Sequence, residues 1–268
     1  MTSTFHNSLA DACHSACQAC GFSGLCLPSG LDTSATANFS GITERRIRLS
    51  DAQTPLYWAG DEFHNVYAVR EGCLKAFSVD SAGNENVRAF HLPGDLVGLD
   101  AIHMQKYPAN AVALESSEIC VIPYANLVRM VSNVPALQRR ILEILSHELS
   151  VSLALAGDYT AEQRLAAFIL HLYQRLRRRN LTNGNTMWLV MPRRDIARYL
   201  RLAVETVSRV LGRFEHECLI EVTNRHLKIL DMAALGRMAE PVGICDIPVV
   251  IRHGPLFSVP VSGPAVAA

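Results

Sequence analysis

Cysteine side chains are the residues of this chain whose type and spacing could support chemistry. Four of the eight cysteines lie within fourteen residues near the N-terminus, with the spacing C-x3-C-x2-C-x5-C, at Cys13, Cys17, Cys20 and Cys26. A further cysteine, Cys120, lies in an apolar segment with the composition of a β-strand. Thiolates hold zinc and iron–sulfur clusters and react with oxidants. The spacing therefore predicts a metal or redox site.

The pattern alone leaves the set of ligands open. A [4Fe–4S] cluster needs four thiolates, and three neighbouring cysteines with one distant cysteine would fasten the N-terminal segment to a folded core. Cys13 could replace one of the others, and four thiolates could instead hold zinc. Zinc is less expected, because its cysteines usually come as two matching C-x2-4-C pairs. Cys73, Cys218 and Cys245 have no partner at ligand spacing, so we interpret them as small apolar residues.

The charge of the chain changes sign along its length. The formal net charge is zero, yet residues 1–163 contain 10 Lys and Arg against 17 Asp and Glu, whereas residues 164–230 contain 13 against 5. An acidic part followed by a basic part indicates a sensing region joined to one that binds nucleic acid. Hydrophobic residues make up 49% of the 268 residues, so the chain can form two globular domains.

Other classes of protein find little support in the sequence. No stretch has the basic and apolar regions of a secretory signal, and no apolar run approaches the roughly 18 residues of a membrane helix. We therefore expect a cytoplasmic protein without a membrane partner, whose cysteines are kept reduced. The ten histidines form no H-x3-H pair on a helix, and no nucleophile elbow is present, so we do not expect an enzyme.

Residues 193–214 have the pattern of a helix-turn-helix, with helices over residues 195–200 and 204–214 and a turn between them. The expected inward-facing residues are Ile196, Ala197 and Leu200 in the first helix and Val207, Val210, Leu211 and Phe214 in the second. Outward-facing residues of a second helix can reach base edges in the major groove. Those of this helix are Glu205, Thr206, Ser208, Arg209 and Arg213. An ordinary charged surface helix with a Glu205–Arg209 ion pair is the alternative.

The elements that position these sites can be predicted from periodicity. Short β-rich stretches at residues 65–69, 74–79 and 87–91, separated by turn residues, predict a small antiparallel barrel or jelly roll. Helical periodicity over residues 161–179 is followed by a turn at 180–185 and a strand at 188–190. A β-hairpin, or wing, is expected from strands at 219–222 and 227–230.

A long helix is predicted from residue 135 to about residue 156. Its apolar residues form two stripes, which are Leu137, Ile141, Ile144, Val151 and Leu155 in one and Leu142, Leu145, Leu149 and Leu153 in the other. A helix that is apolar on two sides needs two partners. We expect its own barrel on one side and the same helix of a second subunit on the other. Burial within a single domain is the alternative.

The expected domains follow from these elements. They are a cysteine-rich segment at 1–30, a β-barrel at 31–134, the long helix at 135–157, a DNA-binding domain at 158–237 and a loose, Pro-rich tail at 238–268.

Two segments of the second helix, residues 204–209 (VETVSR) and 211–214 (LGRF), resemble the recognition helix of the CRP/FNR family of bacterial transcription regulators. The resemblance is strongest to the oxygen sensors of FNR type, covers about residues 10–237, and includes residues 94–98 (GDLVG) and 162–168 (EQRLAAF). It implies an α+β fold, in which a cyclic-nucleotide-binding-like β-barrel (jelly roll) is followed by a long dimerisation helix and a C-terminal winged helix-turn-helix.

The resemblance also implies a function, with residues to perform it. A [4Fe–4S] cluster would be held by Cys17, Cys20, Cys26 and Cys120, and Cys13 would not be a ligand. The cluster would promote a homodimer without oxygen, and oxygen would destroy it. Val204, Glu205, Ser208 and Arg209 would face the bases of a TTGAT-N4-ATCAA-like palindrome in double-stranded DNA. A barrel turn at residues 81–87 would contact RNA polymerase.

Two departures from the family pattern concern the dimer. Ser152 stands where FNR-type sensors carry an aspartate that disfavours pairing of the oxidised form, and the segment from there to Ala161 is about three residues shorter. The strength of the monomer–dimer switch is therefore open.

Three competing functions remain to be compared with the structure. A cyclic-nucleotide regulator would need an Arg-Ser pair for the phosphate, where this chain has Tyr107, Pro108 and Ala109. An electron carrier would have no need of a base-reading helix. A CRP-like regulator could respond to another ligand, or to a cysteine-bound metal such as zinc.

Overall fold

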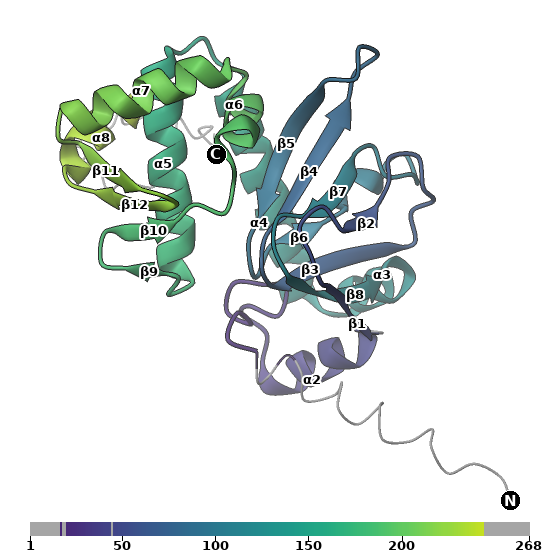
Figure 1. Cartoon of the computed structure of the whole chain (residues 1–268). Coiled ribbons are helices and arrows are strands. Elements are labelled where there is room, and N and C mark those ends of the chain that lie inside the picture. The colour runs from purple at the N-terminus through teal and green to yellow at the C-terminus, as the bar shows by residue number, and fades with distance from the viewer. Residues whose placement is uncertain (1–16, 18–19, 44, 244–268) are drawn as a thin grey trace, which may run out of the picture.

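The computed structural model of the chain describes residues 17, 20–43 and 45–243 (Figure 1). It contains a β-barrel followed by the long helix α4 and by a helical part that carries a small sheet. Cys13, Cys245 and the tail beyond Gly243 lie outside the described residues. None of the described helices is long and apolar enough to cross a membrane.

The barrel is built from two four-stranded antiparallel sheets, with the strand orders β1-β8-β3-β6 and β2-β7-β4-β5. Their bounds are β1 Arg45–Leu49, β2 Pro55–Tyr57, β3 Asn65–Glu71, β4 Leu74–Val79, β5 Glu85–His91, β6 Leu96–Val97, β7 Asn110–Ala113 and β8 Ser117–Pro123. The three strands predicted from the sequence are confirmed as β3, β4 and β5. Four consecutive residues are buried in β3 and in β4, so both faces of these strands are covered, whereas in β5 only Val87 and Phe90 are buried.

Two helices beside the barrel, α2 (Thr33–Ile42) and α3 (Tyr124–Asn133), were not predicted. In α2, the Asp32 side chain caps the helix by accepting from the Ala35 amide at 2.7 Å. The helix nevertheless consists mostly of Thr, Ser, Ala, Asn and Gly, which have mixed helix propensity. Burial of Phe39 in the barrel core stabilises it, and local sequence does not reveal that contact. A short 3-10 turn, η1 (Leu99–Ala101), follows β6.

The long helix is confirmed as α4 (Pro135–Leu155), which begins with the predicted proline. One stripe faces the molecule: Leu137 is fully buried, and Ile141 and Ile144 pack on the barrel core. The other stripe is exposed, with exposed fractions of 60% for Leu142, 39% for Leu145, 61% for Leu149 and 65% for Leu153. Burial within one domain therefore does not account for the second stripe.

The C-terminal part confirms a winged helix-turn-helix. Its elements are α5 (Ala161–Arg178), β9 (Thr182–Asn183), β10 (Thr186–Trp188), α6 (Arg193–Leu200), α7 (Val204–His216), β11 (Ile220–Thr223), β12 (His226–Ile229), α8 (Met232–Ala239) and η2 (Glu240–Val242). Its sheet has the order β11-β12-β10-β9, so the wing hairpin β11–β12 continues into a second hairpin.

Three details differ from the sequence-based expectation. Strand β10 begins at Thr186, two residues before the expected start, because Thr186 and Met187 pair with β9, which lies inside the expected turn, and it ends at Trp188. Leu189 and Val190 follow the strand. Helix α8 and the turn η2 extend the fold past residue 238, because Val242 is buried against the core of the DNA-binding part.

Candidate functional site

The structure brings four of the N-terminal and barrel cysteines to one pocket. Cys17, Cys20 and Cys26 line it from the N-terminal segment, and Cys120 lines it from β8. Strand β8 lies between β1 and β3, where Cys120 is opposite Arg46 and Ala68. A central strand is a rigid support, so the distant cysteine is the fixed wall of the pocket.

The N-terminal segment reaches the pocket through single turns. Backbone bonds from Cys20 to the Cys17 carbonyl (3.3 Å) and from Cys26 to the Phe22 carbonyl (3.0 Å) hold consecutive cysteines close together. The fully buried Leu27 anchors the segment in the barrel core. Ligand-binding loops stabilised by so few contacts open easily without their ligand.

The barrel turn at Gly94 contacts the same segment. Gly94 has φ +91°, and a side-chain carbon at this position would lie 3.1 Å from Cβ of Leu25. Glycine is therefore required for both the turn and the close approach. The Leu25 carbonyl also accepts a hydrogen bond from Arg140 Nη2 of α4 at 2.8 Å. The residue next to Cys26 thus contacts both the barrel turn and the long helix.

Burial makes the thiols of the pocket poor acids. It raises the pKa of Cys26 to about 12 and that of Cys120 to about 11, and the other cysteines of the pocket add to both shifts. Burial also raises the pKa of Cys17, against the effect of the Ser40 hydroxyl beside it. Ionised thiolates would repel one another in this buried pocket, so the thiols stay neutral while the pocket holds no positive charge. A bound cation would be needed to keep them ionised.

The pocket fits an iron–sulfur cluster in its donor set and its surroundings. Within the described ranges, no three His, Cys, Asp or Glu side chains converge closely enough to hold a single ion. A [4Fe–4S] cube takes one thiolate at each iron, so its four ligands stand apart around it. The remaining lining includes the apolar residues Phe22, Phe39 and Ile122, which restrict access of water.

The interior of the barrel does not resemble a phosphate site. Tyr107 is buried and stacks on Tyr57 with ring centroids 3.8 Å apart. Its hydroxyl donates to the Asn65 carbonyl at 2.7 Å. Tyr107 is therefore part of the aromatic core, and Tyr107, Pro108 and Ala109 offer no positive charge to a phosphate, which favours a ligand at the cysteine pocket over a cyclic nucleotide.

The reading helix α7 has the two faces expected from the sequence. Val207, Val210, Leu211 and Phe214 are buried, and so are Ile196, Ala197 and Leu200 of α6. Among the predicted DNA contacts, Val204, Glu205, Arg209 and Arg213 are exposed, and Thr206 and Ser208 are half-buried. No described ion pair involves Glu205 or Arg209, so the ion pair considered for the alternative is not formed.

Arg213 differs from the other predicted contacts. Its guanidinium pairs with Glu162 of α5 at 3.1 Å and with Glu217 at 2.9 Å. It would have to leave these carboxylates to reach DNA. Arg201, which the sequence reading placed only in the turn, is exposed in the left-handed conformation with φ +56°.

A buried ion-pair network joins the barrel to the first helix of the helix-turn-helix, and sequence reasoning missed it. Lys75 of β4 is 1% exposed and lies 3.1 Å from Asp195 of α6, which is also 1% exposed. Glu85 of β5 pairs with Lys75 at 3.0 Å and with Arg198 of α6. Figure 1 shows α6 beside β5. The sequence feature that could have revealed this network is the charge of Lys75 within an otherwise apolar strand.

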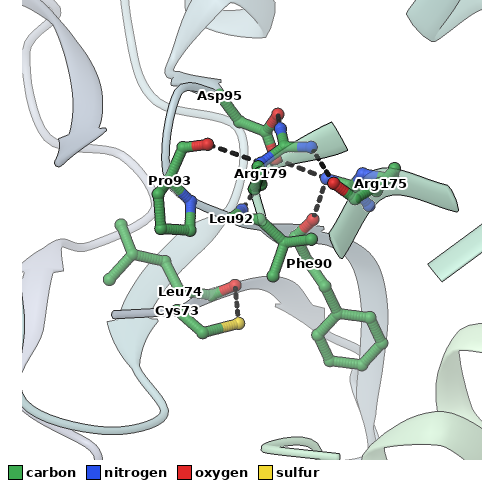
Figure 2. A network of polar contacts seen from close by, with 8 residues as sticks. All are labelled: Cys73, Leu74, Phe90, Leu92, Pro93, Asp95, Arg175 and Arg179. Carbon is green, nitrogen blue, oxygen red and sulfur yellow. Dashed lines mark hydrogen bonds and ion pairs between the residues drawn. The ribbon is translucent and has the colours of Figure 1, made fainter. Parts of the chain in front are cut away.

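A second network joins the Gly94 turn to α5 (Figure 2). Asp95 accepts from both Arg175 and Arg179, and the two guanidiniums also donate to the Phe90 and Pro93 carbonyls. Burial opposes the charge on Asp95, but the two arginines outweigh it and lower its pKa. The turn that contacts the cysteine segment is therefore held to the DNA-binding part.

Comparisons with known proteins agree with both parts of the fold. The cyclic nucleotide-binding domain family matches residues 48–133, and the Crp-like helix-turn-helix domain family matches residues 163–238. Among solved structures, FixK2 from Bradyrhizobium japonicum is 26% identical, with a TM-score of 0.64 over 72% of this chain and 96% of that one.

Curated relatives are more similar in sequence. The fumarate and nitrate reduction regulatory protein of Vibrio cholerae is 38% identical over 226 residues, which are 83% of this chain and 90% of the relative. The transcriptional activator protein FnrA of Stutzerimonas stutzeri is 38% identical, over 83% of this chain and 92% of its own length. The fumarate and nitrate reduction regulatory protein of Escherichia coli K12 is 37% identical, over 83% and 90%.

Proposed function

Because this chain belongs to the CRP/FNR family of transcription regulators, we propose that it is an oxygen-responsive, cytoplasmic regulator that binds DNA when a [4Fe–4S] cluster is present. The observation that carries this proposal is the pocket shared by Cys17, Cys20, Cys26 and Cys120. When bound, the cluster supplies oxygen-sensitive redox chemistry, because its oxidation releases it from the thiolates. The proposed function of this protein includes no enzymatic activity.

The protein contributes a connection from the pocket to the long helix. The hydrogen bond from Arg140 to the Leu25 carbonyl ties the segment beside Cys26 to α4. An ordered segment therefore favours one position of α4. The exposed stripe at Leu142, Leu145, Leu149 and Leu153 is suited to pair with the same stripe of a second copy. Ser152, exposed on that helix, places no charge against this pairing.

Dimerisation and DNA binding are coupled by geometry. Two reading helices of a two-fold dimer fit half-sites one helical turn apart, and one copy alone gains only part of the affinity. We propose a TTGAT-N4-ATCAA-like palindrome as the target. Arg209 is able to bond to guanine and Glu205 to cytosine N4, Val204 provides apolar contact, and Thr206 and Ser208 contribute hydroxyls. Arg213 joins them once freed from Glu162 and Glu217.

A contact with RNA polymerase completes the proposed activator function. The β4–β5 hairpin projects from the barrel (Figure 1), and residues 81–84 at its tip are exposed. An exposed tip on a rigid hairpin is available to a protein partner.

The proposal is tested by purifying the full chain without oxygen and measuring its visible spectrum, its iron and sulfide content, and its mass and operator affinity before and after exposure to air. We expect about four iron and four sulfide per chain, a dimer that binds the palindrome, and loss of all three in air. Colourless protein with zinc alone would favour the alternative, a regulator that responds to cysteine-bound zinc. Equal DNA binding before and after air would exclude oxygen control.

An Arg140→Met variant tests the connection to α4 separately. We expect it to bind the cluster as the parent does but to dimerise less in response to it, because the hydrogen bond to the Leu25 carbonyl is lost together with the exposed ion pair to Glu143 at 3.4 Å. Arg139→Met, a matched change on an exposed neighbouring residue, should leave the response unchanged.

A further inference from the structure

Thr43 lies between α2 and β1, and its side chain lines the cysteine pocket with all four cysteines. The residue is only 5% exposed. Its hydroxyl oxygen is fully buried and has no hydrogen-bond partner among the described residues. A buried polar group without a partner is rare and costly in a folded protein, so this hydroxyl requires an explanation.

The neighbouring hydroxyl of Ser40 gives a direct contrast. Ser40 is also buried beside Cys17, but its hydroxyl donates to the Thr36 carbonyl at 3.1 Å and accepts from the Cys17 amide at 3.3 Å. Its role is therefore complete within the protein: it holds Cys17 in place. Thr43 makes no such bond among the described residues, although its hydroxyl, like that of Ser40, lies close to the Cys17 sulfur. The Ser40 hydroxyl is thus bonded within the protein, whereas the Thr43 hydroxyl has no such bond.

We propose that the Thr43 hydroxyl donates a hydrogen bond to a sulfur atom of the bound iron–sulfur cluster, either the Cys17 thiolate or an inorganic sulfide. This inference rests on the proposed function. Sulfur carries more negative charge when a cluster is reduced, and hydrogen bonds to sulfur are among the means by which a protein sets cluster potential. Thr43 therefore stabilises the reduced cluster and slows its oxidation. Thr43 is a positioning residue, since the thiolates remain the ligands.

The experiment compares Thr43→Val, which keeps the shape and removes the hydroxyl, with Thr43→Ser, which keeps the hydroxyl. Thr33→Val is the matched control, because Thr33 is an exposed residue at the other end of the neighbouring helix α2 and does not line the pocket. For each full-length protein we would measure iron and sulfide content, reduction potential, the rate at which the visible spectrum fades in air, and the melting temperature of the apoprotein.

Removing the Thr43 hydroxyl should have opposite effects on the stability of the bound cluster and on the stability of the apoprotein. Thr43→Val should load the cluster, show a lower reduction potential and lose the cluster in air about fivefold faster, the effect of one ordinary hydrogen bond. Its apoprotein should melt at the same or a higher temperature, because a buried hydroxyl without a partner has been removed. Thr43→Ser and Thr33→Val should behave as the parent.

Two results would overturn the proposal. Unchanged potential and air sensitivity in Thr43→Val would show that the hydroxyl does not contact the cluster. A lower melting temperature of its apoprotein would show that the hydroxyl is bonded within the protein. Failure of Thr43→Val to load, with normal loading by Thr43→Ala, would assign the defect to the bulk of valine, and Thr43→Ala would then supply the potential and the fading rate. If the parent protein itself bound no cluster, the proposed function would fail first, and the two failures are thus distinguishable.

Discussion

The reading helix and the cysteine pocket are built in opposite ways. Helix α7 is complete within the protein, because its apolar face is buried against α5 and α6 and its outer face is polar. The pocket has buried thiols with raised pKa values, a hydroxyl without a partner, and a segment held by single turns. The helix-turn-helix is therefore packed within the protein alone, whereas the pocket contains the thiols and the hydroxyl that we propose interact with a cluster.

Between these regions lies a chain of contacts that could transmit the state of the pocket. Leu25 contacts Gly94, and the adjacent Asp95 binds Arg175 and Arg179 of α5 (Figure 2). These contacts form a continuous, partly buried connection from the cysteine segment to the DNA-binding part.

The largest effect is expected from the pocket itself. Cys120→Ser should abolish cluster binding, because the thiolate on the rigid central strand is lost, while the reading domain stays folded. The measurement is the visible spectrum of anaerobically prepared protein, together with its far-UV circular dichroism. Cys218→Ser, at an exposed cysteine beyond α7, is the control and should keep the full spectrum. Loss of the fold in Cys120→Ser would mean that pocket and reader are not independent.

The next effect concerns the buried pair between barrel and α6. Lys75→Met leaves the buried Asp195 carboxylate with only its long ion pairs to Arg194 (4.0 Å) and Arg198 (3.9 Å), and should lower the free energy of unfolding by about 3 kcal/mol. Denaturation in urea measures this. Adding Asp195→Asn should restore part of the loss, since the orphaned charge is removed. Lys228→Met, at an exposed pair 4.0 Å long, should cost less than about 0.5 kcal/mol. Equal losses at the two sites would contradict the role of burial.

Asp95→Asn should lower the free energy of unfolding by about 2 kcal/mol near neutral pH, because charged hydrogen bonds to Arg175 and Arg179 are weakened. The folded pKa of Asp95 is depressed, so its contribution is present above the unfolded value and is lost as pH falls through the folded value. The difference between variant and parent should therefore shrink below about pH 4. Urea titrations of variant and parent near neutral pH and below about pH 4 measure this difference in the free energy of unfolding. A difference that stays constant would show that the charge of Asp95 does not contribute.

The smallest effect is expected at the turn between α6 and α7 of the helix-turn-helix. Arg201 adopts a left-handed conformation that costs a non-glycine residue about 1 kcal/mol, so Arg201→Gly should stabilise the protein by up to that amount. It should also weaken binding to any DNA, because one positive charge is lost. Arg201→Gln keeps the strain and loses the charge, and should show only the second effect in salt-dependent binding assays. Stabilisation by both variants would contradict a backbone origin.

Periodicity was sufficient for most of the fold. The strands β3, β4 and β5, the long helix with its two stripes, and the buried faces of α6 and α7 were all predicted, because each depends on residues a few positions apart. Helices α2 and α3 were missed, since their stability comes from burial against the barrel rather than from their own composition. The extension through α8 and η2 was missed for the same reason.

For the site, the residue types and spacing of the cysteines predict a metal or redox centre, which stays a prediction, and the pattern of the second helix was enough to identify the helix-turn-helix. The family resemblance grouped Cys120 with the N-terminal cysteines, but only the folded chain shows that they line one pocket, that Thr43 lies there with a buried hydroxyl without a bonded partner, and that Lys75 meets Asp195. These contacts join residues far apart in sequence. Local patterns carry no information about them, because they depend on how the sheets close and where the helices dock.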